Sequence, residues 1–367
     1  MRCVFTAERL ALSLLLVLGV SACDGSSASS SPNDVTDCDS LEADSADAGA
    51  YPLDDVLRLN HIQLKGTHNS YHLAPAELAV PDWDYSHAPL KVQLSKLGVR
   101  QVELDIHWHA EDETFHIYHI PILDDRSTCA TLKECLSEML EWSVAHPDHA
   151  PLFILIEPKD DVDLEPIVGH YDDLDREILE VWPRERVLTP DDARGDHPDL
   201  RKARIEDGWP TLGECRGKAI FQMLDSDEHR ANYLGDPPSL AGRVLFVRGG
   251  EEDPWGGFVE KGAYADSEED LKALALAGMI LRSSPDNILP EKAPDNPIRA
   301  AIAIRAGVHL ISTDMPAPVE DGYWFELPDG VAARCNPITA PPECTPEDVE
   351  NLSGGVDHWP NPLEAME

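Results

Sequence analysis

The sequence places a histidine and an amide side by side after a short apolar run. The run covers residues 60–66, and His68 and Asn69 stand in the turn that follows. An imidazole can exchange a proton near neutral pH, and an amide oxygen is a ligand that hard cations accept. The pair indicates acid–base chemistry beside a metal ion.

A second stretch of the sequence carries two carboxylates that could act together with this pair. Glu103 and Asp105 stand two positions apart in an apolar run, and residues two apart on a strand point to the same face. Acids on the interior face of a strand are costly unless they are paired or hold a metal. Together with His119 further along the chain, they predict acid–base chemistry at a hard-cation site.

The elements that must position these residues follow an alternating pattern of strands and helices. We expect strands near residues 60–66, 99–106, 115–119, 152–156, 219–224, 244–248, 279–282 and 310–313. We expect helices over residues 88–97, 131–145, 165–181, 267–277 and 297–306. Such alternation indicates a parallel sheet covered by helices.

The repeating part of the chain, residues 57–316, has about the length of a (βα)8 barrel, which typically takes about 250 residues. We therefore predict an α/β fold of the closed (βα)8 TIM-like type, which need not be regular. An open doubly wound sheet is the alternative, but the chain has no glycine-rich turn of the dinucleotide-binding kind.

Polar side chains recur at the predicted strand ends. In a parallel barrel, catalytic groups gather at the C-terminal ends of the strands. A single histidine there is more often structural than catalytic, so the joint placement carries the prediction. The residues concerned are His68, Asn69, Glu103, Asp105, His119, Glu157, Lys159, Arg282 and Asp314.

Composition limits the class of partner. The 367 residues include 69 acids and 29 bases, which gives a formal net charge of −40. So acidic a surface repels polyanions, and we expect no nucleic-acid partner.

The N-terminal residues predict export. Residues 1–22 read as a lipoprotein signal peptide, with small residues before Cys23, the expected site of lipid attachment. Residues 23–50 are rich in Ser, Ala and Asp and predict a disordered tether. The barrel domain is expected over residues 51–325 and a Cys- and Pro-rich tail over residues 326–367. We expect a monomer, anchored to a bacterial membrane on the periplasmic side or the cell surface.

Six further cysteines fit an exported chain, in which disulfides form. Cys129 with Cys135, and Cys335 with Cys344, are the natural pairs because they are close in sequence. Cys38 with Cys215 would then remain. Sequence alone does not fix the pairing.

The motifs together resemble the catalytic barrel of the phosphatidylinositol-specific phospholipase C superfamily, particularly its calcium-dependent bacterial branch. The resemblance covers most of residues 57–316. Relatives that do not need calcium carry an arginine where this chain has acids on the second strand. The matching segments are residues 66–71, 102–105, 117–119, 154–157 and 307–314.

The resemblance implies calcium-dependent cleavage of phosphatidylinositol-type lipids to diacylglycerol and an inositol (cyclic) phosphate. It implies that His68 contacts the phosphate, that His119 is the general acid, and that Glu157 or Glu103 takes the inositol hydroxyl proton. Lys159 and Arg282 are the implied substrate-binding residues. The implied calcium ligands are Asn69, Glu103, Asp105 and Glu157, all of which offer oxygen.

Three alternatives remain beside this hypothesis. A glycerophosphodiester phosphodiesterase shares the barrel, although that family usually has arginine where Asn69 stands. A zinc hydrolase is suggested by Asp105, His107 and His109 on one strand face, but the two histidines more simply line the barrel mouth as hydrogen-bonding groups. A non-catalytic surface lipoprotein that binds a headgroup is the alternative from another class.

Overall fold

Eight parallel strands form a nearly closed barrel with helices between them, which confirms the predicted fold class. The structure is a computed structural model that describes residues 51–160, 165–224, 227–289, 293–318 and 322–351. All of these residues belong to one compact unit, residues 47–367. The expected signal peptide and tether lie outside the described residues.

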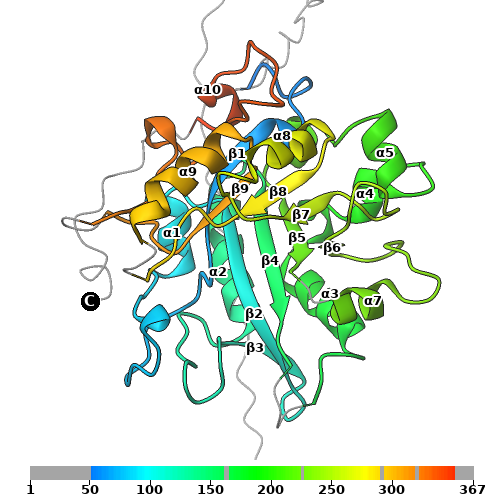
Figure 1. The fold of residues 1–367 in the computed structure, drawn as a ribbon. Coiled ribbons are helices and arrows are strands. Elements are labelled where there is room, and N and C mark those ends of the chain that lie inside the picture. Colours follow the sequence, from blue (N-terminus) through cyan, green and yellow to red (C-terminus); the bar gives the residue numbers. More distant parts are fainter. Residues whose placement is uncertain (1–50, 161–164, 225–226, 290–292, 319–321, 352–367) are drawn as a thin grey trace, which may run out of the picture. The chain divides into compact units, whose positions relative to one another are not determined.

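The strands follow one another around the barrel in the order β6-β5-β4-β2-β1-β9-β8-β7 (Figure 1). A single parallel bridge between Arg248 and Phe258 joins β6 to β7. The strands are β1 (Ile62–Thr67), β2 (Gln101–His109), β3 (Thr114–Ile117), β4 (Leu152–Pro158), β5 (Ala219–Met223), β6 (Phe246–Val247), β7 (Phe258–Glu260), β8 (Ile280–Ser283), β9 (Leu310–Thr313) and β10 (Ala333–Cys335).

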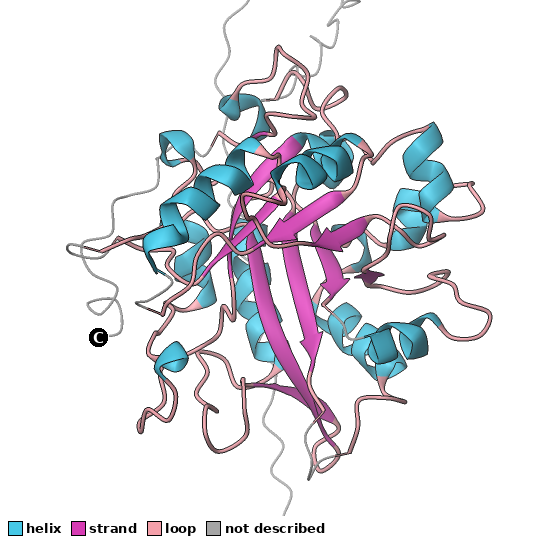
Figure 2. Ribbon diagram, in the orientation of Figure 1, coloured by secondary structure: helices cyan, strands magenta, loops and turns pink. Residues whose placement is uncertain are grey.

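Helices lie around the strands (Figure 2). They are α1 (Leu90–Lys96), α2 (Leu132–Ala145), α3 (Tyr171–Val181), α4 (Pro190–Arg194), α5 (Leu200–Glu206), α6 (Leu212–Cys215), α7 (Asp227–Leu234), α8 (Glu268–Leu276), α9 (Asn296–Arg305) and α10 (Pro346–Val349). None of the helices in the described part of the chain has the length and apolar character needed to cross a membrane.

Local sequence accounts for where the helices begin. The Thr131 side chain accepts a hydrogen bond from the Glu134 amide and caps α2. Helix α9 carries a proline in its first turn, where the missing N–H costs nothing.

The buried faces of α2 and its neighbours pack on the strands in one apolar cluster. A second cluster consists of side chains from the barrel strands, among them Leu64, Phe153, Ile220, Phe246 and Phe258.

Two strand assignments differ from the prediction. The strand predicted near residues 115–119 is β3, which pairs antiparallel with β2 and stands outside the parallel set. The eighth parallel strand is instead β7. It has too few residues for an alternating pattern of apolar and polar side chains to be visible in the sequence. In the predicted tail, β10 pairs antiparallel with β1.

Two predicted disulfides are present, Cys129–Cys135 and Cys335–Cys344. Cys215, which was predicted to pair with Cys38, is instead a free thiol that is fully buried in the core. Cys38 lies outside the described residues.

Candidate active site

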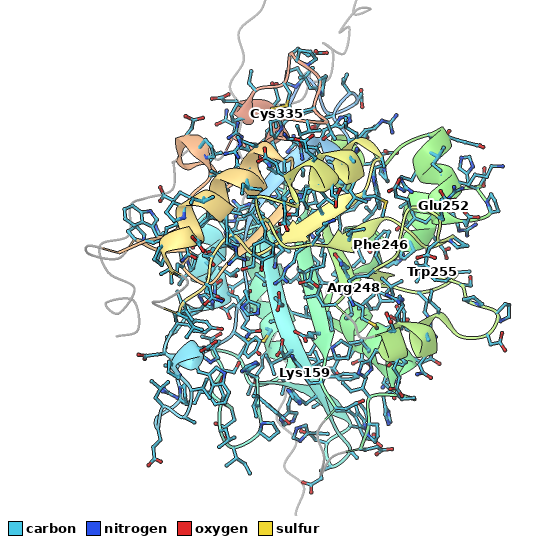
Figure 3. The ribbon with its side chains drawn as sticks, in the orientation of Figure 1. Lys159, Phe246, Arg248, Glu252, Trp255 and Cys335 are labelled. Carbon is cyan, nitrogen blue, oxygen red and sulfur yellow. A yellow bond between two sulfur atoms is a disulfide. The ribbon has the colours of Figure 1, made fainter. Side chains whose placement is uncertain are left out.

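The predicted site residues follow strands whose C-terminal ends meet. Asp105 of β2 pairs in register with Glu157 of β4. On the other side of β2, Thr67 pairs with Thr313, so the turn that starts at His68 adjoins Asp314. Lys159 lies just past the end of β4, and Cys335 lies near the opposite end of the strands in this view (Figure 3).

Three carboxylates form the centre of the site. Oxygens of Glu103, Asp105 and Glu157 all lie within 4.8 Å of one another. The first two are buried, at 1% and 0% exposed. Burial, and then the neighbouring Glu157, raise the pKa of Asp105 well above its usual range. Burial likewise raises the pKa of Glu103, against the opposing effect of Arg282. Acids held this close are a natural cation site.

Unpartnered oxygens support the same interpretation. The Asn69 Oδ1 atom and both carboxylate oxygens of Asp105 are buried and accept no hydrogen bond from any described residue. Buried polar atoms without partners are rare and call for an explanation. Asn69 has a φ of 43°, a left-handed conformation that asparagine tolerates. The four predicted calcium ligands therefore fit a hard cation, because all four offer oxygens and the buried oxygens of Asn69 and Asp105 accept no hydrogen bond from the described residues.

His68 is held between two acids. Its Nδ1 atom lies 2.6 Å from Asp314 Oδ1, and its Nε2 atom lies 3.6 Å from Glu103 Oε1. Burial acts to lower the pKa of His68, but the carboxylates of Asp314 and Glu103 outweigh it and raise the pKa to about 10. With 36% of its side chain exposed, His68 offers a positively charged donor to an anionic ligand.

The two predicted substrate-binding cations both contact the acid cluster. Arg282 Nη2 donates to Glu103 Oε2 at 2.5 Å, and its other terminal nitrogen donates to Glu260. Lys159 Nζ lies 2.6 Å from Glu157 Oε1 and 3.3 Å from Asp105 Oδ2. The structure thus brings both cations to the site, where they neutralise acids.

His119 stands in the loop after β3 and not at the end of a parallel strand. Its Nδ1 atom lies 2.7 Å from Asp124 Oδ2. Burial lowers the pKa of His119, and the Asp124 carboxylate opposes that effect. It lines a pocket with Glu157 and Lys159.

Two pockets are each lined by one predicted catalytic histidine, and acids of the cluster lie at or beside both. His68 lines the second pocket with Arg282, Asp286 and Asp314. Glu157 lines the first pocket, while Glu103 contacts His68 in the second. A substrate that spanned both pockets would meet His68 on one side and His119 on the other.

The zinc alternative finds no support in the geometry. His107 Nε2 donates to the Tyr118 carbonyl oxygen at 2.7 Å, and His109 Nε2 lies 3.1 Å from the Tyr118 hydroxyl. The candidate metal group found among the described residues contains neither histidine. Both imidazoles serve as hydrogen-bonding groups, as the simpler interpretation expects.

Sequence reasoning missed several residues that support the site. Asp124 and His72 form hydrogen bonds with each other, and the Tyr85 hydroxyl accepts from Asn69 Nδ2 at 3.3 Å. All three stand in loops without periodic pattern, so no sequence signal could have placed them.

The fold is a barrel, and the site combines a cluster of acids that could hold a cation with His68 beside Glu103. Comparison with protein families matches residues 57–114 and 109–337 to "Phosphoinositide phospholipase C, Ca2+-dependent". The match covers well over half of the chain, and the protein belongs to this enzyme family. The resemblance inferred from the motifs is thereby confirmed at the level of the family.

Solved structures show the same barrel. A Ca2+-dependent phosphatidylinositol-specific phospholipase C from Streptomyces antibioticus is 19% identical and matches with a TM-score of 0.54, over 71% of this chain and 96% of that one. A calcium-dependent phosphoinositol-specific phospholipase C from a Gram-negative Pseudomonas species, in a myoinositol complex, is 16% identical with a TM-score of 0.56, over 79% of this chain and 100% of that one. At these identities the likeness supports the fold. A comparison with curated proteins gave no match.

Proposed function

We propose that this protein cleaves the phosphodiester bond of phosphatidylinositol-type lipids with calcium as cofactor, releasing diacylglycerol and an inositol (cyclic) phosphate. Family membership supports the reaction class. The observation that carries the proposal is the cluster of Glu103, Asp105 and Glu157, with oxygens within 4.8 Å of one another, beside the histidine that is 3.6 Å from Glu103.

Asn69, Glu103, Asp105 and Glu157 would hold the calcium ion. When bound, the ion supplies positive charge that stabilises the negative charge on a reacting phosphoryl group. Burial raises the pKa of Asp105 and Glu103 because their negative charges are unfavourable without a counter-ion, and a bound cation would supply that counter-ion.

His68 and His119 would have different roles in the cleavage of the phosphodiester. His68, whose pKa of about 10 keeps it protonated, donates a hydrogen bond to a phosphate oxygen and stabilises its charge. His119 delivers a proton from Nε2 to the departing diacylglycerol oxygen. A lowered pKa makes its imidazolium the stronger acid. Glu103 or Glu157 would take the inositol hydroxyl proton.

Lys159 and Arg282 are proposed to bind phosphate or inositol oxygens. Each now contacts a carboxylate of the acid cluster. A cation bound by the same acids would compete with both side chains, which leaves their N–H groups available to an anionic substrate.

A panel of phosphodiesters assayed with calcium and with a chelator tests the proposal. We expect turnover of phosphatidylinositol with calcium and none with the chelator. Calcium-independent turnover of glycerophosphodiesters would show the alternative enzyme. Binding of a headgroup without turnover of any diester would show a non-catalytic protein.

Export and membrane attachment through Cys23 are a separate proposal, supported by the signal-like residues 1–22. Mass spectrometry of the protein from membranes should find a lipidated Cys23 as the first residue. The Cys23→Ser variant should be recovered without lipid. We propose a monomer, which light scattering of the soluble domain checks.

A further inference from the structure

A buried carboxylate outside the acid cluster contacts two imidazoles. Asp124 Oδ2 lies 2.7 Å from His119 Nδ1, and Asp124 Oδ1 lies 2.8 Å from His72 Nε2. Asp124 and His72 are 0% and 1% exposed. A buried charge persists only where it is paired and hydrogen-bonded, and these two contacts satisfy that requirement.

A tight turn between Ile120 and Asp124 brings the Asp124 side chain next to His119. The Ile120 amide donates to the Asp124 carbonyl at 2.9 Å, and the Asp124 amide donates to the Ile120 carbonyl at 3.0 Å. Ile122 at the tip has a φ of 68°, a conformation that is unfavourable for a β-branched residue. The turn therefore keeps a strained shape that brings the carboxylate to the histidine.

His72 belongs to the loop that also carries His68 and Asn69. Its amide donates to the Asn69 carbonyl at 2.8 Å, and its ring stacks on Tyr85 at 4.2 Å between centroids. Asp124 thus joins the loop after β1, which bears His68, to the loop after β3, which bears His119.

Counting hydrogen-bond donors assigns the protons. His72 Nδ1 lies 3.1 Å from the Tyr85 carbonyl oxygen, which can only accept, so this nitrogen carries a proton. The other ring nitrogen of His72, Nε2, lies 2.8 Å from Asp124 Oδ1, and a carboxylate accepts hydrogen bonds. His119 Nδ1 then donates to the same carboxylate. For His119 this leaves Nε2 as the nitrogen that can meet a substrate.

We propose that Asp124 is a positioning residue: it fixes His119 with a proton on Nδ1 and, through His72, holds the His119 loop against the His68 loop. The role in turnover rests on the proposed function, whereas the proton assignment does not. Asp124 and Lys159 are among the charged groups that act on His119, and Asp124 is in hydrogen-bond contact with it.

Long-range proton–nitrogen NMR spectra of the wild-type protein test the assignment without any substrate. We expect neutral His119 to carry its proton on Nδ1, the nitrogen that faces Asp124. A His119 with its proton on Nε2 would overturn the proposal, whatever the turnover measurements show.

Asp124→Asn tests the consequence for catalysis, with the exposed neighbour Asp125 as the matched control. Asparagine replaces one of the two acceptor oxygens by an NH2 donor, so one of the two imidazoles would face a donor, and His119 should become a mixture of tautomers. We expect kcat to fall on the order of 10- to 100-fold with KM changed less than about threefold, while Asp125→Asn keeps wild-type values. An unchanged kcat in a folded Asp124→Asn protein would contradict the positioning role.

Discussion

The two candidate catalytic histidines differ because their surroundings move their pKa values in opposite directions. Two carboxylates contact His68 and raise its pKa to about 10. His119 has one carboxylate partner, and burial lowers its pKa. Titratable groups whose pKa values are shifted in opposite directions by their surroundings are suited to different proton-transfer roles. At the scale of residues, this difference is the main support for two-histidine catalysis.

Alanine substitutions should confirm that both imidazoles act on the substrate. We expect His68→Ala and His119→Ala each to lower kcat about 100- to 10,000-fold while calcium binding, measured by calorimetry, remains within a few-fold. His197, which pairs with Asp207 at a site away from both histidines, supplies the control. Wild-type turnover in either variant would remove that residue from the mechanism.

The environment of His119 also predicts its titration. Burial is the largest effect and lowers its pKa, so we expect NMR to show a pKa below the ordinary 6.5. Because the Asp124 carboxylate acts to raise the pKa, Asp124→Asn should lower it further. A His119 that titrates above 6.5 in the wild-type protein would contradict this account of its surroundings.

At the scale of elements, the site depends on the register of strands that are distant in sequence. The pairing of Asp105 with Glu157 brings the acids together, and strand β1 places His68 beside Asp314. Strands with long apolar runs, such as β2 and β4, could be predicted because their pattern is local. The direction of β3 could not, because alternation is the same in parallel and antiparallel strands.

Loop residues mark the limit of prediction from sequence. His68, Glu103 and Glu157 could be found because they stand directly at or within apolar runs. Asp124 could not, because a turn with a left-handed Ile122 brings it to His119. The contacts of Lys159 and Arg282 with the acids also follow from tertiary structure alone.

Gly66 shows how closely β1 and β2 approach. Gly66 lies opposite Gln101 in the register of these two strands. A Cβ atom on Gly66 would lie 2.0 Å from Gln101 Oε1 and 2.9 Å from its Cβ. We expect Gly66→Ala to lower the free energy of unfolding by about 1–3 kcal/mol, measured by denaturant titration.

Gly250 is the matched control for this substitution. A Cβ atom added at Gly250 would have its nearest neighbouring atom 3.6 Å away. Gly250→Ala should therefore leave the free energy of unfolding within about 0.5 kcal/mol of the wild-type value. Equal effects of the two substitutions would show that the β1–β2 contact does not require glycine.

At the scale of the whole molecule, a net charge of −40 and a cluster of buried acids favour cation binding over the binding of polyanions. The sequence allowed the family to be predicted because its motifs are spread over most of the barrel. Composition alone indicated only an acidic protein, since the same charge could have been spread evenly over the surface.

Calcium should therefore stabilise the folded protein. A ligand that binds only the folded state raises the melting temperature, and here it also offsets the burial and the repulsion by Glu157 that together raise the pKa of Asp105. We expect millimolar calcium to raise Tm by several degrees and a chelator to reverse the effect. Asp105→Asn should lose most of the shift, while Asp112→Asn, at an exposed carboxylate, should keep it. Equal shifts in all three proteins would place the ion elsewhere.

The rate of diacylglycerol release from phosphatidylinositol vesicles, followed during a calcium titration, tests the central claim most directly. The wild-type rate should rise from background to saturation as calcium is added. The Asp105→Asn protein, folded to the same extent, should stay near background or need far more calcium. A rate that is the same with calcium and with chelator, or the same in the two proteins, would contradict the account.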